Sequence, residues 1–249
     1  LAAAAALLRD LDATIICVSD FQRHGVQATL RRRLGPGLVR TKTIYNPIDD
    51  ELAPDGSPVD PCKLVFFSSP NKGLAFTLDV FRAVRRRMPD MRLLVANPGY
   101  KHWRPVSIDG VEWLGPLPHE RVLAHVRTAL CTFCLNFVIP ETFGLVFAES
   151  KALGTPVLAH ACGAADEVLA DVRQTLPVTA AHRAYEATAG LLPPRLRGVP
   201  ARIADRLGLF EQHVERIRAW RSGERPSTGP DPRFFRSTVV GQWRELLRT

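Results

Sequence analysis

The stretch Pro140 to Ala159, PETFGLVFAESKALGTPVLA, decides the fold of this chain of 249 residues. An apolar run over residues 130–135 leads into it, and a second apolar run begins at Val157. Between the two runs, Gly144 marks the expected start of a helix. A strand, a loop, a helix and a second strand form the repeating unit of a parallel sheet. The stretch therefore predicts an α/β fold.

Two carboxylates, Glu141 and Glu149, bracket the loop and the first turns of this helix. Backbone amides near Gly144 lack helical partners and face the positive end of the helix dipole, so a phosphate fits there. One acid before the helix and one in its second turn could hold hydroxyl groups on either side of that phosphate. A nucleotide sugar has this layout of ribose, diphosphate and hexose. The alternative is an ordinary βαβ unit with two solvated glutamates.

The stretch resembles the signature of the retaining GT-B glycosyltransferases of group 1, also called family 4. Their signature is two glutamates separated by seven residues, followed by an alanine-glycine-x-Pro-Val pattern, here Ala152 to Val157. The resemblance extends with gaps from Ile15 to Leu169 and returns in the last helix. It implies a Rossmann-like parallel sheet flanked by helices, which is the GT-B C-terminal domain, together with a remnant of a second Rossmann-like domain.

The resemblance also implies roles for the residues of the signature. Glu149 would accept hydrogen bonds from the ribose, and Glu141 would orient hydroxyl groups of the transferred sugar. Backbone amides of Phe143, Gly144 and Leu145 would stabilise the diphosphate. Retention of the anomeric configuration without a metal ion is implied as well.

A second phosphate contact is expected after the apolar strand 63–69, in the turn Pro70-Asn71-Lys72-Gly73. A lysine at the mouth of a helix suits a diphosphate, because the dipole and the ammonium group both oppose its charge. The turn resembles the Lys-Gly turn of the family. The arginine that usually precedes it is absent, and Ser68 and Ser69 stand in that region. The alternative for Lys72 is a solvated residue at a helix start.

Further candidates follow other strands. Asn97 lies after the strand 91–96, where open α/β sheets place ligands. Leu117 lies in the loop that the family sets against the nucleotide base. His119 is either functional or solvated, and Glu167 is either the family's matching acid or an ordinary acid of a helix start. The expected catalytic residues are Glu141 and Lys72, and the expected donor-binding residues are Ser68, Ser69, Asn71, Lys72, Asn97, Leu117, Glu141, Thr142, Phe143, Gly144, Leu145 and Glu149.

The expected domain organisation has one large unit and a fragment of another. Residues 1–49 read as the C-terminal part of the acceptor-side domain, most of which is missing from this sequence. Residues 50–61 form the linker, 62–220 the donor-binding domain, 221–232 a loop and 233–249 a crossover helix. Within these units the apolar spacing predicts one helix over 200–221 and another over 234–247.

Composition limits the class of protein. The five cysteines are odd in number, and Cys131 and Cys134 lie in an expected buried strand without an accompanying histidine cluster. We therefore expect small core residues in a reducing cytoplasm and no zinc. The net charge is +8, which indicates either a genome rich in arginine or a peripheral contact with acidic membrane on its inner face. No basic patch interleaved with aromatic residues indicates nucleic acid.

The sequence thus predicts a retaining glycosyltransferase that uses a UDP-, GDP- or ADP-sugar and an unknown acceptor, which could be a glycan, a lipid or a small molecule. The alternative is a nucleotide-sugar binding module without catalytic activity of its own. A Rossmann dehydrogenase is disfavoured, because no G-x-G-x-x-G follows a strand. Neither the donor base and sugar nor the oligomeric state can be read from these residues.

Overall fold

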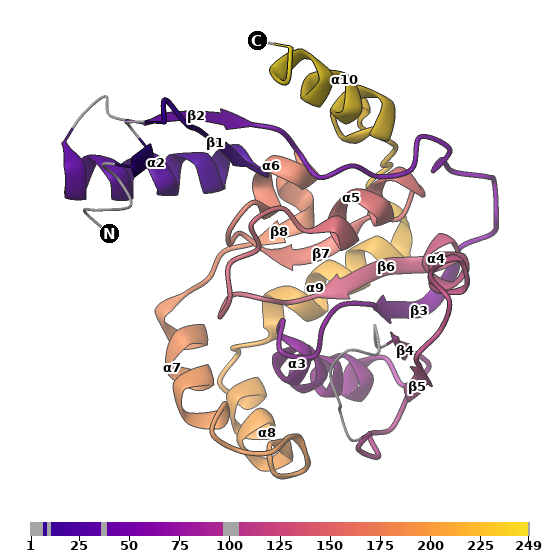
Figure 1. Ribbon diagram of the computed structural model, residues 1–249. Coiled ribbons are helices and arrows are strands. Elements are labelled where there is room, and N and C mark those ends of the chain that lie inside the picture. Colours follow the sequence, from indigo (N-terminus) through magenta and orange to yellow (C-terminus); the bar gives the residue numbers. More distant parts are fainter. Residues whose placement is uncertain (1–6, 9–10, 36–38, 97–104, 249) are drawn as a thin grey trace.

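The computed structural model describes residues 7–8, 11–35, 39–96 and 105–248 (Figure 1). Its larger sheet has six strands in the order β5-β4-β3-β6-β7-β8, and every neighbouring pair is parallel. The strand order reverses between β3 and β6, and open sheets bind ligands at such a point. The strands are β3 (Asp60–Phe66), β4 (Arg92–Ala96), β5 (Val111–Gly115), β6 (Ala129–Cys134), β7 (Val157–His160) and β8 (Thr175–Leu176).

Both faces of this sheet are buried, as a parallel sheet requires. Leu64 and Phe66 of β3 belong to one apolar cluster, whereas Val65 and the following Phe67 belong to another. Helix α3 contacts α8 and α9, while α4 and α6 both contact α5. The flanking helices are α3 (Leu74–Arg87), α4 (His119–Arg127), α5 (Leu145–Ala152), α6 (Ala165–Leu169), α7 (Ala180–Ala189), α8 (Gly198–Arg206) and α9 (Glu211–Ala219).

The N-terminal part forms a separate small unit. Strands β1 (Thr14–Cys17) and β2 (Arg40–Thr43) pair in parallel, and α2 (Asp20–Leu34) connects them. The hydroxyl oxygen of Ser19 accepts a hydrogen bond from the amide of Gln22 at 3.0 Å, so Ser19 caps α2. This βαβ piece beside the six-stranded sheet matches the expected remnant of a second Rossmann-like domain.

The last helix, α10 (Arg236–Leu246), begins against the segment that leaves the small unit. Ile48 forms a parallel bridge with Phe235, and the carboxylate of Asp50 accepts from the amide of Ser237 at 3.2 Å. In Figure 1 the helix lies on the same side of the large sheet as β1 and β2. The division into domains at residues 49, 61, 220 and 232 stays a prediction.

Two expected boundaries were wrong. The single helix expected over 200–221 is two helices, because the chain turns between Leu207 and Phe210 and Gly208 has a φ of 79°. Apolar spacing continued across this turn and concealed it. The strand expected over 63–69 is β3, which begins at Asp60 and ends at Phe66, because Asp60 pairs with Ala129 of β6.

The cysteines of β6 are core residues, as predicted. Cys131 and Cys134 are free thiols and at most 1% exposed. Burial raises the pKa of Cys134 to about 12, so its thiol is protonated and inert near neutral pH.

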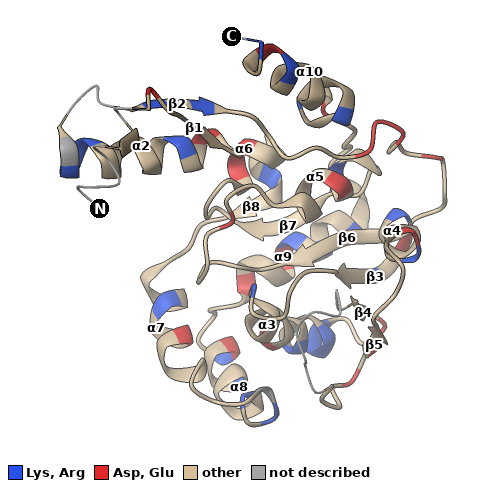
Figure 2. Cartoon of the chain, in the orientation of Figure 1, with Lys and Arg blue, Asp and Glu red and all other residues tan. Residues whose placement is uncertain are grey.

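The surface charge is dispersed. Figure 2 shows Lys and Arg on α2, α3, α7 and α10 alike, with Asp and Glu between them. Within the described ranges, every helix is too short or too polar to cross a bilayer.

Candidate functional site

A cavity of about 430 Å³ opens beyond the carboxyl ends of β3 and β6, at the point where the strand order reverses. The loop after β3, the loop after β6 and the start of α4 surround it. Its lining combines apolar walls with two carboxylates, one ammonium group and one imidazole. It is lined by Asn46, Phe67, Ser68, Ser69, Lys72, Ala96, Leu117, His119, Val122, Glu141, Thr142, Phe143, Gly144, Leu145, Val146 and Glu149.

The loop after β3 supplies hydroxyl groups and a cation. The side chains of Ser68 and Ser69 are buried, and the Ser69 hydroxyl donates to the side-chain oxygen of Asn71. Asn71 therefore supports the loop from behind, and it is absent from the cavity lining. Gly73 has a φ of 83°, and a Cβ there would lie 2.4 Å from the carbonyl oxygen of Leu135. Glycine thus lets the two loops approach closely and aims Lys72 at the cavity.

Glu141 and Lys72 form an ion pair in the cavity. The Lys72 ammonium nitrogen lies 2.8 Å from Oε2 of Glu141, whose side chain is only 6% exposed. The other carboxylate oxygen of Glu141, Oε1, is buried and has no hydrogen-bond partner in the described residues. A buried carboxylate oxygen without a donor is costly. A hydroxyl group of a bound ligand would remove that cost.

The backbone of Glu141 is held from the opposite side by the loop after β7. The amide of Ala164 donates to the carbonyl oxygen of Glu141 at 2.9 Å, and Gly163 bridges to Glu141. Gly163 has a φ of 71°, and a Cβ on it would lie 2.3 Å from that same oxygen. This contact has no room for a side chain.

We expect Gly163→Ala to displace Glu141 and to lower both stability and ligand affinity. A left-handed φ alone destabilises a non-glycine residue by about 1–2 kcal/mol, and the backbone clash adds to this. Gly208→Ala is the matched control, because Gly208 has a φ of 79° with open space around its Cα. Urea unfolding should show the larger loss for Gly163→Ala, and equal losses would contradict the clash.

Helix α5 presents its start to the cavity. Its N-cap is Gly144, with a φ of 90° and no capping side chain, so its first amides are available to an anion. Phe143 is 1% exposed and packs against Phe234 with ring centroids 5.1 Å apart. Its side chain anchors the loop to the segment before α10 and leaves only its backbone for a ligand.

Glu149 and His119 form a second pair in the cavity. Oε1 of Glu149 lies 2.9 Å from Nε2 of His119. Burial raises the pKa of the Glu149 carboxyl, and His119 opposes that rise. The His119 side chain is 60% exposed while it contacts the acid, so its functional role stays a prediction.

Some of the remaining candidate site residues line the cavity and others do not. Leu117 and Thr142 line the cavity as expected, and Asn97 lies outside the described residues. Glu167 lies elsewhere, because its carboxylate accepts from the amides of Asp20 and Phe21 at 2.8 and 2.9 Å. It therefore caps α2 and ties the small unit to the large one.

Sequence reasoning missed several lining residues. Asn46 comes from the segment between β2 and β3, and only the Asn-Pro break after the strand pointed to it. Phe67, Ala96, Val122 and Val146 are apolar wall residues without a motif. They reach the cavity because the strands and helices that carry them converge there.

Comparison with known proteins assigns this chain to a family. The family model described as glycosyl transferases group 1 matches residues 61–192. A phosphatidylinositol N-acetylglucosaminyltransferase subunit from Arabidopsis thaliana is 30% identical over 178 residues, covering 66% of this chain and 38% of that protein. D-inositol 3-phosphate glycosyltransferase of Acidothermus cellulolyticus is 30% identical over 199 residues, covering 70% of this chain and 43% of that protein. The chain thus spans less than half the length of these relatives.

Solved structures share the fold. The GtfA/B complex superposes with a TM-score of 0.61 at 14% identity, covering 94% of this chain and 45% of that chain. Anabaena HepE in complex with UDP-glucose superposes with a TM-score of 0.57 at 18% identity, covering 95% of this chain and 64% of that chain. The six-stranded parallel sheet with its flanking helices is therefore that of the GT-B glycosyltransferases.

Proposed function

The chain belongs to the glycosyl transferases group 1 family, and from this premise we propose that it carries the donor-binding half of an enzyme that transfers a sugar from a nucleoside-diphosphate sugar. The observation that carries the proposal is the pairing of two acids across the start of α5. Lys72 pairs with Glu141 and His119 pairs with Glu149, and both pairs line the same cavity as Gly144 at the start of α5.

The donor would lie across the helix start. Glu149 would accept hydrogen bonds from the ribose, and the amides after Gly144 would hold the diphosphate. Oε1 of Glu141, which lacks a partner in the described residues, would accept from a hydroxyl group of the sugar. The donor could be a UDP-, GDP- or ADP-sugar. The fold shared with HepE, which was solved with UDP-glucose, is compatible with a donor of this class.

Lys72 would act on the departing group. As the bond between sugar and phosphate breaks, negative charge grows on the diphosphate, and an ammonium group and oriented amides stabilise it. We propose retention of the anomeric configuration, without a metal ion at this cavity. Both carboxylates are assigned to donor binding, so the two-carboxylate scheme of the glycoside hydrolases does not apply.

A lipid acceptor at a membrane surface is the acceptor class we favour. The names of the relatives refer to phosphatidylinositol and to inositol phosphate. Around α8 a stripe of exposed apolar side chains lies among exposed arginines, and such a surface suits peripheral contact with anionic lipid. The apolar residues are Leu196, Val199, Ile203 and Leu207, and the arginines are Arg195, Arg202 and Arg206. Cosedimentation with phosphatidylglycerol vesicles, released by salt and absent with phosphatidylcholine, tests this contact and a cytoplasmic, membrane-peripheral location.

Calorimetry with UDP-, GDP- and ADP-sugars tests the donor site. Glu149→Gln should weaken binding of the preferred donor about 10- to 100-fold, because a hydrogen bond to a charged group contributes about 1.5–3 kcal/mol. Glu120→Gln, an exposed acid next to His119, is the control and should leave affinity unchanged. Donor binding without transfer by this chain supports a binding module. No binding of any sugar nucleotide overturns the proposal.

A further inference from the structure

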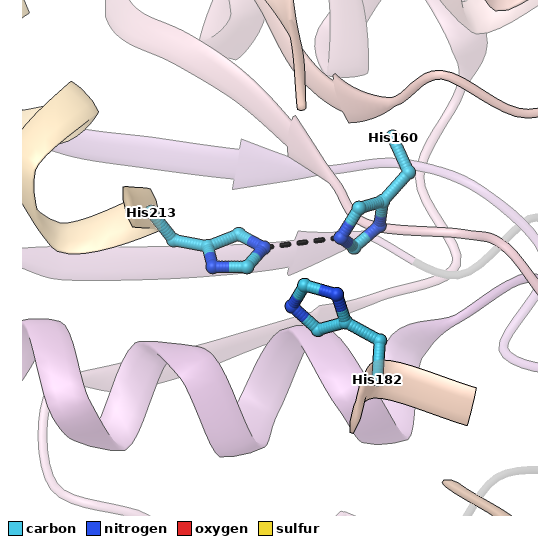
Figure 3. Close-up of side chains that lie close together, drawn as sticks. All are labelled: His160, His182 and His213. Atoms are coloured by element: carbon cyan, nitrogen blue, oxygen red, sulfur yellow. Dashed lines mark hydrogen bonds between the residues drawn. The ribbon is translucent and has the colours of Figure 1, made fainter. Parts of the chain in front are cut away.

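Three histidines from distant parts of the chain converge in the core (Figure 3), and none of them lines the donor cavity. His160 ends β7, His182 lies in the first turn of α7 and His213 lies in α9. One ring nitrogen from each lies within 4.8 Å of the other two. Their side chains are 1%, 4% and 0% exposed. The site thus joins one strand of the sheet to two of its covering helices.

The protein satisfies the hydrogen-bonding groups of these rings only in part. A neutral imidazole has one donor and one acceptor nitrogen, and each needs a partner when buried. His160 and His213 share one contact, with their Nε2 atoms 3.1 Å apart. Nδ1 of His160 is buried without a hydrogen-bond partner among the described residues. The backbone of Phe210 approaches the ring of His213 and that of Leu209 the ring of His182, although Nδ1 of His213 and Nε2 of His182 make no hydrogen bond of strict geometry. Aromatic rings such as Phe76 and Phe137 surround the cluster and offer no acceptor.

The spacing fits a tetrahedral metal ion. Two nitrogens bound to one Zn²⁺ at 2.0–2.1 Å lie roughly 3.3 Å apart, close to the 3.1 Å between His160 and His213. Two Nε2–H groups or two lone pairs at that distance would repel, and only one proton can lie between them. A metal ion can replace that proton, because it accepts a lone pair from each ring.

The rings are also in the right protonation state. Burial lowers the pKa of all three histidines, that of His213 to about 3. They are therefore neutral near pH 7, as metal ligands must be.

One capping bond competes with the ion for His182. The amide of Thr179 donates to Nδ1 of His182 at 3.1 Å, which places the ring proton on Nε2. Oγ1 of Thr179 lies 2.9 Å from the same Nδ1 and can instead accept a proton from it. That second tautomer leaves the lone pair of Nε2 free for a metal. The exchange costs the bond from the amide and the contact of the ring with the backbone of Leu209, each about 1 kcal/mol, which together are small beside the affinity of a zinc site.

The cluster has an approach from outside. His182 lines a surface groove of about 630 Å³ between α7 and α8, together with Thr179, Ala184, Ile203 and Leu209. An ion could enter from this groove, and a water molecule there could complete four ligands. None of the three histidines lines the donor cavity. The site is thus suited to holding the fold together and is separate from the transfer chemistry.

We propose that His160, His182 and His213 bind one Zn²⁺ ion that cross-links β7, α7 and α9. Imidazole nitrogens are preferred ligands of this ion, and three protein ligands leave a fourth position for a water molecule from the groove. Residues 160 and 213 are 53 positions apart, so no short zinc motif marks the site in the sequence.

The test uses the chain without a histidine tag, stripped with a chelator and then titrated with Zn²⁺ alone. We expect one ion per chain by elemental analysis. At 100 times the dissociation constant the ratio of folded to unfolded chain rises about 100-fold, which raises the melting temperature by roughly 5–10 °C. Co²⁺ in place of Zn²⁺ should give the visible absorption of tetrahedral coordination.

Two variants and a control decide the outcome. His182→Phe and His213→Leu should lose the ion and the melting shift, while each remains folded by circular dichroism, because an apolar ring or chain suits the surrounding aromatic core. His182 lines the surface groove, so His182→Phe disturbs the core less than His213→Leu does. If His213→Leu fails to fold, His182→Phe alone tests the loss of the ion. His24→Ala, an exposed histidine of α2, should bind the ion as the native chain does. A folded native chain that takes up no Zn²⁺, or no more than His182→Phe takes up, overturns the proposal.

Discussion

Replacing Lys72 with alanine should lower the rate of sugar transfer about 10²- to 10³-fold, which corresponds to roughly 3–4 kcal/mol of lost transition-state stabilisation. The Lys72 ammonium group lies in the cavity 2.8 Å from Oε2 of Glu141. It faces the position assigned to the departing diphosphate, whose negative charge increases during the reaction. The loss should therefore appear mainly in kcat, with a smaller change in KM.

The measurement is the initial rate at saturating and at limiting donor. Where this chain alone does not turn over, calorimetry with the free nucleoside diphosphate measures the same contact. Lys72→Arg keeps the charge and should retain part of the activity, whereas Lys42→Ala, which changes a lysine of β2 outside this cavity, should leave it unchanged. A Lys72→Ala variant with native kcat would remove Lys72 from the mechanism.

Replacing Arg197 with methionine should destabilise the fold by about 3–5 kcal/mol. Arg197 is 1% exposed, and its Nε lies 2.6 Å from Asp79, which is fully buried at the centre of α3. The guanidinium group also bonds Glu186 at 2.7 Å and the carbonyl oxygen of Ala189 at 3.1 Å. Methionine retains the apolar stem of the side chain but removes the guanidinium group that pairs with the buried Asp79 carboxylate.

Urea unfolding checks this prediction through the midpoint at constant slope. Arg195→Met is the matched control, because Arg195 lies two positions away and is exposed. It should change stability by no more than about 0.5 kcal/mol. The double variant Arg197→Met with Asp79→Leu should recover part of the loss, since it removes the buried charge together with its partner. A loss below about 1 kcal/mol in Arg197→Met alone would show that this network contributes little.

Local patterns predicted most strands of the large sheet, because β4, β6 and β7 are short apolar runs bounded by turn residues. Strand β8 has only two residues, Thr175 and Leu176, and was not predicted. β6, β7 and the helix between them follow from the single stretch 130–159. The prediction of one helix over 200–221 was wrong, although it was based on the same kind of local apolar pattern as the strands. Apolar spacing reports which face is buried, and it continued across Gly208, where the backbone turns.

The candidate site was predictable to the extent that its residues are close in sequence. Glu141, Gly144 and Glu149 lie within nine positions, and the structure places all three around one cavity. Lys72 was expected on a strand-turn-helix junction, and it also reaches the cavity. Glu167 was ambiguous in sequence, because a carboxylate at a helix start is common, and only its bonds to Asp20 and Phe21 show what it holds.

What the sequence determined by itself was the parallel sheet, the order of its units and the loops that carry the acids. These features depend on the spacing of apolar and turn residues within some twenty positions. The local backbone geometry of helices and strands fixes which of those residues share a face. The tertiary structure alone decided which polar side chains meet: Lys72 with Glu141 across 69 positions, His119 with Glu149 across 30, and His160 with His213 across 53. The physical reason is that these contacts arise from the packing of separate strands and helices, and the identity of a residue does not specify its distant neighbour until the core has brought the two together.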